Sequence, residues 1–308
     1  MSPGLRNRNV IKKKKDVLVL RAKILDLIRL FFKEREFIEV ETPFILPYII
    51  PEAYIDPIKT EVGYLHTSPE LCMKMLLGLG CNNIFQICKC FRKGERSKIH
   101  LPEFTMLEWY HVGIDYNKLM EECELLIRNI CYKLFNKEKI NYQGNEVDLA
   151  TPWNRISLTN AFEKYANISL YEAVDKGIFE EILVYKVEPK LGFKQPVFVK
   201  DYPASMAALA KLQDHNPNIA ERFELYICGL EIANGYTELT DMAEMKKRWE
   251  TENQKRTQMG KCVYPFPNGY KINIPDCSGV ALGIDRLIML FSDKDRIDSV
   301  VSMLSEDI

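Results

Sequence analysis

This chain of 308 residues lacks the features that most quickly assign a protein to a class. It has no stretch of about 20 apolar residues and no signal peptide, so the sequence predicts neither a transmembrane helix nor secretion. A GxxxxGK segment is absent, which excludes a Walker-type phosphate loop. The nine cysteines contain no CxxC pair, although Cys88 and Cys90 are two apart on a predicted strand. This spacing indicates neither a zinc site nor a disulfide framework.

An excess of charge of one sign is lacking as well. The formal net charge is −1, so no global basic field would attract nucleic acid. One local exception, Arg6–Lys15, is interpreted as a solvated tail rather than a polyanion contact, and we expect residues 1–15 to be disordered. Free thiols in a chain that is 47% hydrophobic indicate a reducing compartment. We therefore expect a soluble cytoplasmic protein with no membrane partner.

The pattern of apolar residues predicts an α+β fold in which helices flank one mainly antiparallel sheet. Helical spacing occurs over residues 16–33, 71–79, 116–135, 241–255 and 280–291. Strands are predicted within residues 37–41, 84–110, 193–199 and 222–239, and residues 151–190 are expected to form a strand followed by short helices. Ser68 and Pro69 have the residue types typical of an N-cap and a first helical position.

The most informative segment, residues 84–110, is predicted to be a hairpin with its chemistry on one face. Side chains alternate along a strand, so Phe104, Glu108 and Tyr110 share a face, and Arg92 stands at the exit of the preceding strand. This set suits a purine that stacks, a phosphate for the arginine and an amine for the carboxylate. Aromatic and charged pairs also occur on ordinary hairpins, so the segment alone leaves both interpretations open.

A second hairpin, residues 221–239, carries two acids. If Cys228-Gly229 is a two-residue turn, Tyr226 pairs with Glu231. Glu224 and Glu231 then share a face as diagonal neighbours, close enough to bind one cation. Two acids on a half-buried face favour a metal or a cationic partner, and two solvated acids on an edge strand are the alternative.

Two weaker signals lie farther along the chain. Asn234 and Glu238 share a face of the second hairpin unless a bulge at Asn234-Gly235 changes the facing. Gly279 and Gly283 permit close backbone approach before a predicted helix whose one arginine, Arg286, can stack on a base or pair with a phosphate. Apolar helices with one arginine are common, so this pattern is weak alone.

Together these features resemble the three motifs of class II aminoacyl-tRNA synthetases over residues 16–292. Residues 37–43 with the preceding helix resemble motif 1, residues 91–108 motif 2, and residues 279–286 motif 3. Residues 67–71, 100–110 and 231–239 resemble the lysyl-specific branch. The resemblance implies a class II synthetase catalytic domain over residues 16–308, ATP and Mg²⁺ as cofactors, and a homodimer built through motif 1.

The resemblance also implies roles for individual residues. Arg92 and Arg286 would be catalytic, and Glu224 and Glu231 would hold Mg²⁺. The ATP contacts would be Arg92, Lys93, Gly94, Glu95, His100, Phe104, Glu231, Ile232, Gly283 and Arg286. The amino-acid substrate would contact Ser68, Pro69, Glu70, Glu108, Tyr110, Asn234, Glu238 and Ala281.

Two departures from the family pattern affect the ATP site. Synthetases usually read Phe-Arg-Asn-Glu in motif 2, whereas Gly94 here delays the acid, Glu95, by one residue. The usual asparagine before the proline is Leu101. Whether Glu95 or the backbone contacts the adenine amine is left open.

Only about fifteen residues precede motif 1, whereas lysyl-tRNA synthetases carry an anticodon-binding domain there. The chain is therefore similar to the elongation factor P–(R)-β-lysine ligase family, whose members carry alanine at the place of Ala281 where lysyl-tRNA synthetases carry glycine. This similarity implies ATP-dependent activation of (R)-β-lysine, or lysine, and transfer to a lysine of elongation factor P, with tRNA not a partner. The alternatives are a tRNA-charging lysyl-tRNA synthetase core and a non-catalytic paralogue that binds an amino acid or its adenylate.

Overall fold

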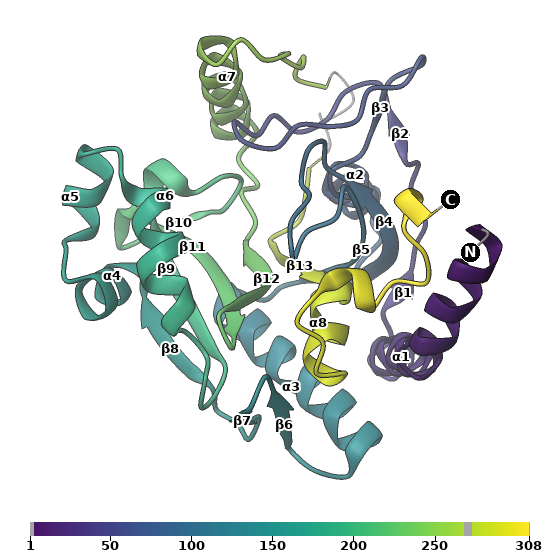
Figure 1. The fold of residues 1–308 in the computed structure, drawn as a ribbon. Coiled ribbons are helices and arrows are strands. Elements are labelled where there is room, and N and C mark those ends of the chain that lie inside the picture. The colour runs from purple at the N-terminus through teal and green to yellow at the C-terminus, as the bar shows by residue number, and fades with distance from the viewer. Residues whose placement is uncertain (1–2, 268–272, 308) are drawn as a thin grey trace.

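The computed structural model describes residues 3–267 and 273–307, and Figure 1 shows its arrangement around one large sheet. In spatial order this sheet contains β1 (Ile38–Glu39), β4 (Ile84–Phe91), β5 (Glu103–Val112), β13 (Cys277–Gly283), β12 (Leu230–Thr237), β11 (Asn216–Ile227), β9 (Val197–Pro203) and β8 (Asn154–Ser157), with β10 (Leu212–Gln213) beside β11. Only β1 with β4 and β8 with β9 run parallel. The expected α+β fold with a mainly antiparallel sheet is thus confirmed.

Helices and two small sheets surround it. The helices are α1 (Pro3–Lys33), α2 (Glu70–Gly78), α3 (Tyr116–Phe135), α4 (Leu158–Ala166), α5 (Leu170–Asp175), α6 (Phe179–Ile182), α7 (Met242–Gln258) and α8 (Ile284–Phe291). The small sheets pair β2 (Ile45–Leu46) with β3 (Tyr64–Leu65), and β6 (Lys139–Tyr142) with β7 (Asn145–Asp148). No helix in the described ranges is both long and apolar enough to cross a bilayer.

The main core fixes which face of the sheet is free for chemistry. Apolar side chains of α1, α3 and α8 pack on one face, where they meet Leu107 and Trp109 of β5 and Leu282 of β13. Since side chains alternate along a strand, the residues between these, including Glu108 and Ala281, point to the opposite face. We call this opposite face of β4, β5, β13, β12 and β11 the site face.

Several predicted elements have the predicted positions. The helix over residues 116–135 is α3, with Asp115 as N-cap, and the helix predicted from residue 241 is α7, capped by Asp241. The two predicted hairpins are present as β4–β5 and β11–β12. Pairing of Ile227 with Leu230 confirms the two-residue turn at Cys228-Gly229.

The N-terminal prediction is wrong in its conformation. Residues 3–15 continue helix α1 rather than forming a disordered tail, and residues 1 and 2 of the predicted tail lie outside the described residues. The four successive lysines 12–15 are good helix formers, so the charge run does not interrupt the helix. Lys14 also donates to the carbonyl of Val301 at 3.2 Å, which connects α1 to the C-terminal segment.

Three other boundaries are corrected. Pro69, not Ser68, is the N-cap of α2, although Ser68 Oγ accepts a 3.4 Å hydrogen bond from Glu70 N. Residues 280–283 belong to strand β13 rather than to the helix, because an apolar run alone does not distinguish a buried strand from a buried helix. The strand predicted at residues 193–199 begins at Val197.

Candidate active site

One row of side chains crosses the site face at its centre. Strand pairing aligns Gln86 of β4 with Glu108 of β5, Glu108 with Ala281 of β13, Ala281 with Asn234 of β12, and Asn234 with Glu224 of β11. Paired residues on neighbouring strands point to the same side of a sheet. The structure therefore brings together the predicted substrate residues Glu108, Ala281 and Asn234.

The neighbouring row depends on a glycine. Tyr110, Gly279 and Tyr236 are aligned on β5, β13 and β12. A Cβ at Gly279 would lie 2.4 Å from Tyr110 Cε1 and 2.5 Å from Glu238 Oε1, so only glycine leaves room for both side chains. The Tyr110 hydroxyl donates to Glu108 Oε1 at 2.7 Å, which orients this carboxylate. The close approach expected at Gly279 is confirmed.

A buried lysine, which the sequence interpretation missed, joins two of the predicted acids. Lys74 Nζ lies 2.6 Å from Glu70 Oε1 and 2.5 Å from Glu238 Oε2, and the Lys74 side chain is fully buried. The Tyr236 hydroxyl donates to the same Glu70 oxygen at 2.7 Å. The i,i+4 spacing of Glu70 and Lys74 is visible in the sequence, but it resembles an ordinary surface pair of a helix.

Burial perturbs the protonation of two acids of this group, Glu238 and Glu108. Burial raises the pKa of Glu238 to about 8 despite the nearby Lys74 ammonium. Burial also raises the pKa of Glu108 well above its usual range, with Glu70 adding to the effect. Glu108 Oε2 is buried and has no hydrogen-bond partner among the described residues. Two carboxylic acids, Glu70 and Glu238, thus contact one buried ammonium, and Glu108 Oε2 can accept a further positively charged group.

Arg92 lies at the exit of β4, as predicted. Its guanidinium carbon is 5.1 Å from the centre of the Phe104 ring, and Nε donates to the carbonyl of Thr67 at 3.4 Å. Glu95 Oε2 is 3.9 Å from an Arg92 nitrogen. Gly94 has a positive φ of 80°, a backbone conformation that favours glycine, and an added Cβ would meet no atom within 4 Å.

Arg286, in the predicted motif 3, connects this motif to motif 2 and to strand β12. It donates to the carbonyl of Glu231 at 2.6 Å, approaches Glu231 Oε2 at 3.3 Å, and donates to His100 Nε2 at 2.6 Å. Burial, and then the charges of Arg286 and Arg92, lower the pKa of His100 to about 4. His100 is therefore a neutral acceptor at physiological pH, which keeps Arg286 in a fixed position.

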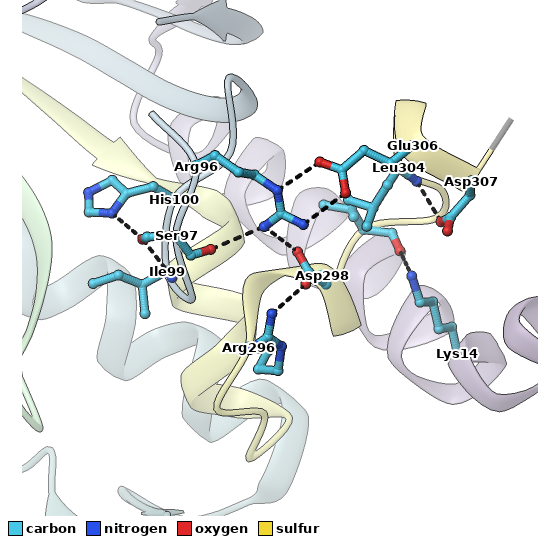
Figure 2. Close-up of polar contacts among 11 residues, drawn as sticks. Lys14, Arg96, Ser97, Ile99, His100, Arg296, Asp298, Leu304, Glu306 and Asp307 are labelled. Atoms are coloured by element: carbon cyan, nitrogen blue, oxygen red, sulfur yellow. Dashed lines mark hydrogen bonds and ion pairs between the residues drawn. The ribbon is translucent and has the colours of Figure 1, made fainter. Parts of the chain in front are cut away.

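The loop between Arg92 and His100 is attached to the C-terminal segment (Figure 2). Arg96 binds both oxygens of Glu306, at 2.9 and 3.3 Å, and one oxygen of Asp298 at 2.9 Å. Ser97 Oγ lies 2.8 Å from His100 Nδ1, so the attachment continues to His100 and Arg286. Nothing in the local sequence around residue 306 indicates this contact, because the two segments are about 200 residues apart.

The two predicted metal-binding acids are on the site face with a third acid beside them. Glu224 accepts from Arg222 at 2.6 Å, and the Tyr226 hydroxyl lies 2.7 Å from Glu224 and 3.0 Å from Glu188. Burial, with the charges of Glu231 and Glu224 adding to it, raises the pKa of Glu188 to about 7. The sequence interpretation missed Glu188, which lies on a short 3-10 turn.

A bulge brings Asn234 to the same face as these acids. Tyr226 pairs with Glu231 as predicted, but the register then shifts, and Glu224 pairs with Asn234. The extra residue lies at 232–233 rather than at the predicted Asn234-Gly235. The side chain of Ile232 packs in the main core, so only its backbone can contribute to the predicted ATP contact.

A matched pair of glycine substitutions tests the packing of the site face. Gly279→Ala is expected to lower the free energy of unfolding by about 1–3 kcal/mol, because the new methyl group overlaps Tyr110 and Glu238. Gly283→Ala should change it by less than about 1 kcal/mol, since the nearest atom is 3.9 Å away. Urea denaturation of both variants measures these changes. Equal losses in the free energy of unfolding would contradict the close contact of Gly279 with Tyr110 and Glu238.

The comparisons with a family model and with individual known proteins agree with one another. The family model of the class II tRNA synthetases (D, K and N) matches residues 6–303. A protein of Vibrio atlanticus named elongation factor P–(R)-β-lysine ligase is 41% identical over 302 residues, covering 92% of this chain and 93% of the relative. Proteins with the same name from Salmonella arizonae and Vibrio cholerae are each 38% identical, covering 92% of this chain and 94% and 93% of their own lengths.

Proposed function

We propose a function that starts from the family: the chain belongs to the class II tRNA synthetases and, within them, to the elongation factor P–(R)-β-lysine ligases. It is an adenylate-forming ligase. Its substrate is (R)-β-lysine, which it activates with ATP and transfers to a lysine side chain of elongation factor P. The observation that carries the substrate assignment is the buried ammonium of Lys74 between Glu70 and Glu238, together with the buried oxygen of Glu108 that has no partner among the described residues.

Charge balance supports a substrate with two amines. Glu70, Glu108 and Glu238 offer three negative charges when ionised, and Lys74 supplies one positive charge. Two protonated amines would complete the balance, because buried charges need partners. Glu108 Oε2, buried and unpartnered among the described residues, is the acceptor that we assign to one amine. Glu238 and Tyr110 are assigned to the other amine.

The remaining predicted substrate residues surround this group. Ser68 and Pro69 precede α2 and bring its first turn toward the acids. Asn234 and Ala281 lie in the same row as Glu108. The position of Ala281 beside Glu108 supports our proposal that its methyl group helps to choose between β-lysine and α-lysine.

The reaction follows from the positions of the two arginines. A carboxylate oxygen of the substrate attacks the α-phosphorus of ATP, a new O–P bond forms, and the bond to pyrophosphate breaks. Arg92 stabilises the negative charge that develops on the phosphate oxygens. Phe104 and Arg286 hold the adenine, with Lys93, Gly94, Glu95 and Gly283 completing the nucleotide contacts. Positioning supplies most of the acceleration.

The second step transfers the acyl group. The target amine of elongation factor P attacks the carbonyl carbon of the adenylate, a C–N bond forms, the amine loses a proton, and AMP leaves. No residue on the site face needs to form a covalent intermediate.

The residues present fit a magnesium ion. Glu224 and Glu231, with Glu188 beside them, provide the carboxylate oxygens that this ion prefers. The mutual repulsion that contributes to the raised pKa of Glu188 is the observation that favours a cation here. When bound, Mg²⁺ neutralises the charge of the polyphosphate. Ion pairs with Arg222 and Arg286 orient the carboxylates of Glu224 and Glu231, respectively.

Magnesium titration tests this assignment. In pyrophosphate exchange, the double variant Glu224→Gln/Glu231→Gln is expected to need at least about tenfold more Mg²⁺ for half-maximal rate, because neutral amides bind the ion less tightly. Glu180→Gln is a control, since the proposal gives this nearby acid no role. If the Mg²⁺ titration curves of the double variant and the parent coincide, the proposal is contradicted.

We also propose a homodimer. Large apolar side chains remain exposed on the outer side of α1, β1 and α3, among them Leu30, Ile38, Leu125 and Tyr132. Such side chains together mark an association surface. Light scattering at micromolar concentration is expected to give twice the mass of the chain, and a monomer mass would contradict the dimer. The free thiols of all nine cysteines support the proposed cytoplasmic location.

A paired transfer assay tests the function directly. Purified protein, ATP and radiolabelled (R)-β-lysine or α-lysine are incubated with elongation factor P or with tRNA. We expect label on elongation factor P, with (R)-β-lysine preferred, and we expect Ala281→Gly to narrow this preference by about 1–3 kcal/mol. Label on tRNA with α-lysine preferred would instead support a tRNA-charging enzyme. Absence of any adenylate from folded protein would support the non-catalytic alternative.

A further inference from the structure

Three soft ligand atoms lie together beside the active site, and the proposed reaction uses none of them. They belong to His66, Cys88 and Cys90, all of which are buried, and one ligand atom from each lies within 4.8 Å of the others. Cys88 and Cys90 are two residues apart along β4, so both point to the site face, next to Phe104 and Ala281. The spacing of these residues in the sequence did not indicate a metal site, because His66 is more than twenty residues from the thiols.

The separation of the two sulfur atoms fits a shared metal ion. Cys88 Sγ and Cys90 Sγ are 4.0 Å apart. Two thiolates that bind one zinc ion at ~2.3 Å each stand about 3.8 Å apart in tetrahedral geometry. The two sulfur atoms therefore need only a small adjustment to bind one ion, and the His66 nitrogen lies within 4.8 Å of both. The thioether of Met106, 3.8 Å from Cys90 Sγ, offers a further soft contact from the facing strand.

The hydrogen bonding of His66 leaves one ring nitrogen prepared to bind. His66 Nε2 is 2.6 Å from the carbonyl oxygen of Lys89. A carbonyl can only accept, so Nε2 carries the proton and Nδ1 carries the lone pair. His66 Nδ1 is buried without a hydrogen-bond partner in the described part of the chain, and the residue is only 1% exposed. Metal-binding histidines are commonly oriented in this way by a carbonyl on the other nitrogen.

We propose that His66, Cys88 and Cys90 form a binding site for a thiophilic d¹⁰ cation, Zn²⁺ or Cu⁺. Two thiolates and an imidazole are soft or borderline ligands that select such ions over Mg²⁺. The site is thus separate in chemistry from the proposed magnesium site at Glu224 and Glu231. It is also linked to the substrate site, because His66 begins the segment that leads through Ser68 to Glu70.

Metal binding by the intact, reduced chain tests the proposal. The protein is freed of metal with a chelator under anaerobic conditions and then titrated with Zn²⁺, or with Cu⁺, in competition with a chromogenic chelator. We expect one ion of either kind per chain. Cys88→Ser and Cys90→Ser should each weaken binding at least about tenfold, and His66→Gln should do the same. Loading with Co²⁺ should produce a thiolate charge-transfer band that the serine variants lack.

Cys262→Ser is the matched control, because Cys262 is an exposed thiol far from the cluster in the sequence. It should bind as tightly as the parent. Two separate serine variants keep the test decisive if one of them fails to fold, as judged by circular dichroism. Absence of binding by fully reduced parent protein, or equal binding by a folded Cys88→Ser or Cys90→Ser variant, would overturn the proposal and leave the thiols as core packing.

Discussion

The buried ion pairs of Lys74 with Glu70 and Glu238 are the interaction on which the rest of the site depends. A fully buried ammonium is costly unless carboxylates compensate it. Here the two carboxylates come from α2 and from the residue just after β12, so the ion pairs hold the helix against the sheet. They also leave Glu108 as an acid whose second oxygen lacks a partner among the described residues. The same group of residues therefore fixes α2 against the sheet and favours the binding of a positively charged group.

The sheet places the other groups relative to these ion pairs. Gly279 is a position where only glycine fits, because the ring of Tyr110 and the carboxylate of Glu238 occupy the space that a side chain would need. The bulge near residue 232 orients side chains of β12 in the part of the site where we propose that ATP binds. It allows Glu231 and Asn234, three residues apart, to face the same way, which regular alternation would not permit.

Much of this arrangement was predictable from local patterns. Alternation along β5 identified the shared face of Glu108 and Tyr110, and the turn at Cys228-Gly229 gave the pairing of Tyr226 with Glu231. What could not be predicted depends on contacts between distant segments. Lys74 resembles a surface residue until Glu238 is brought beside it. The attachment of Arg96 to Glu306 likewise arises only when the C-terminus returns to the motif 2 loop.

Some errors have a local cause. The apolar run through β13 and α8 has no breaker at the point where strand becomes helix, so periodicity alone could not locate residue 284 as the start of the helix. The charge run near the N-terminus was interpreted as a tail, although lysines are compatible with a long helix. The family relationship and the charge balance nevertheless both support the proposed diamino-acid substrate.

Proton release on substrate binding is the most direct test of that charge balance. Burial raises the pKa of Glu238 to about 8 despite Lys74, so its pairing with the ammonium becomes fully ionic only as the pH rises through that value. An ammonium favours the carboxylate form, so binding should expel a proton, and affinity for (R)-β-lysine should rise as the pH increases from about 6.5 toward 8. Calorimetry in two buffers of different ionisation enthalpy measures this release. We expect a clear release that Glu238→Gln reduces; pH-independent binding without proton release would contradict the account.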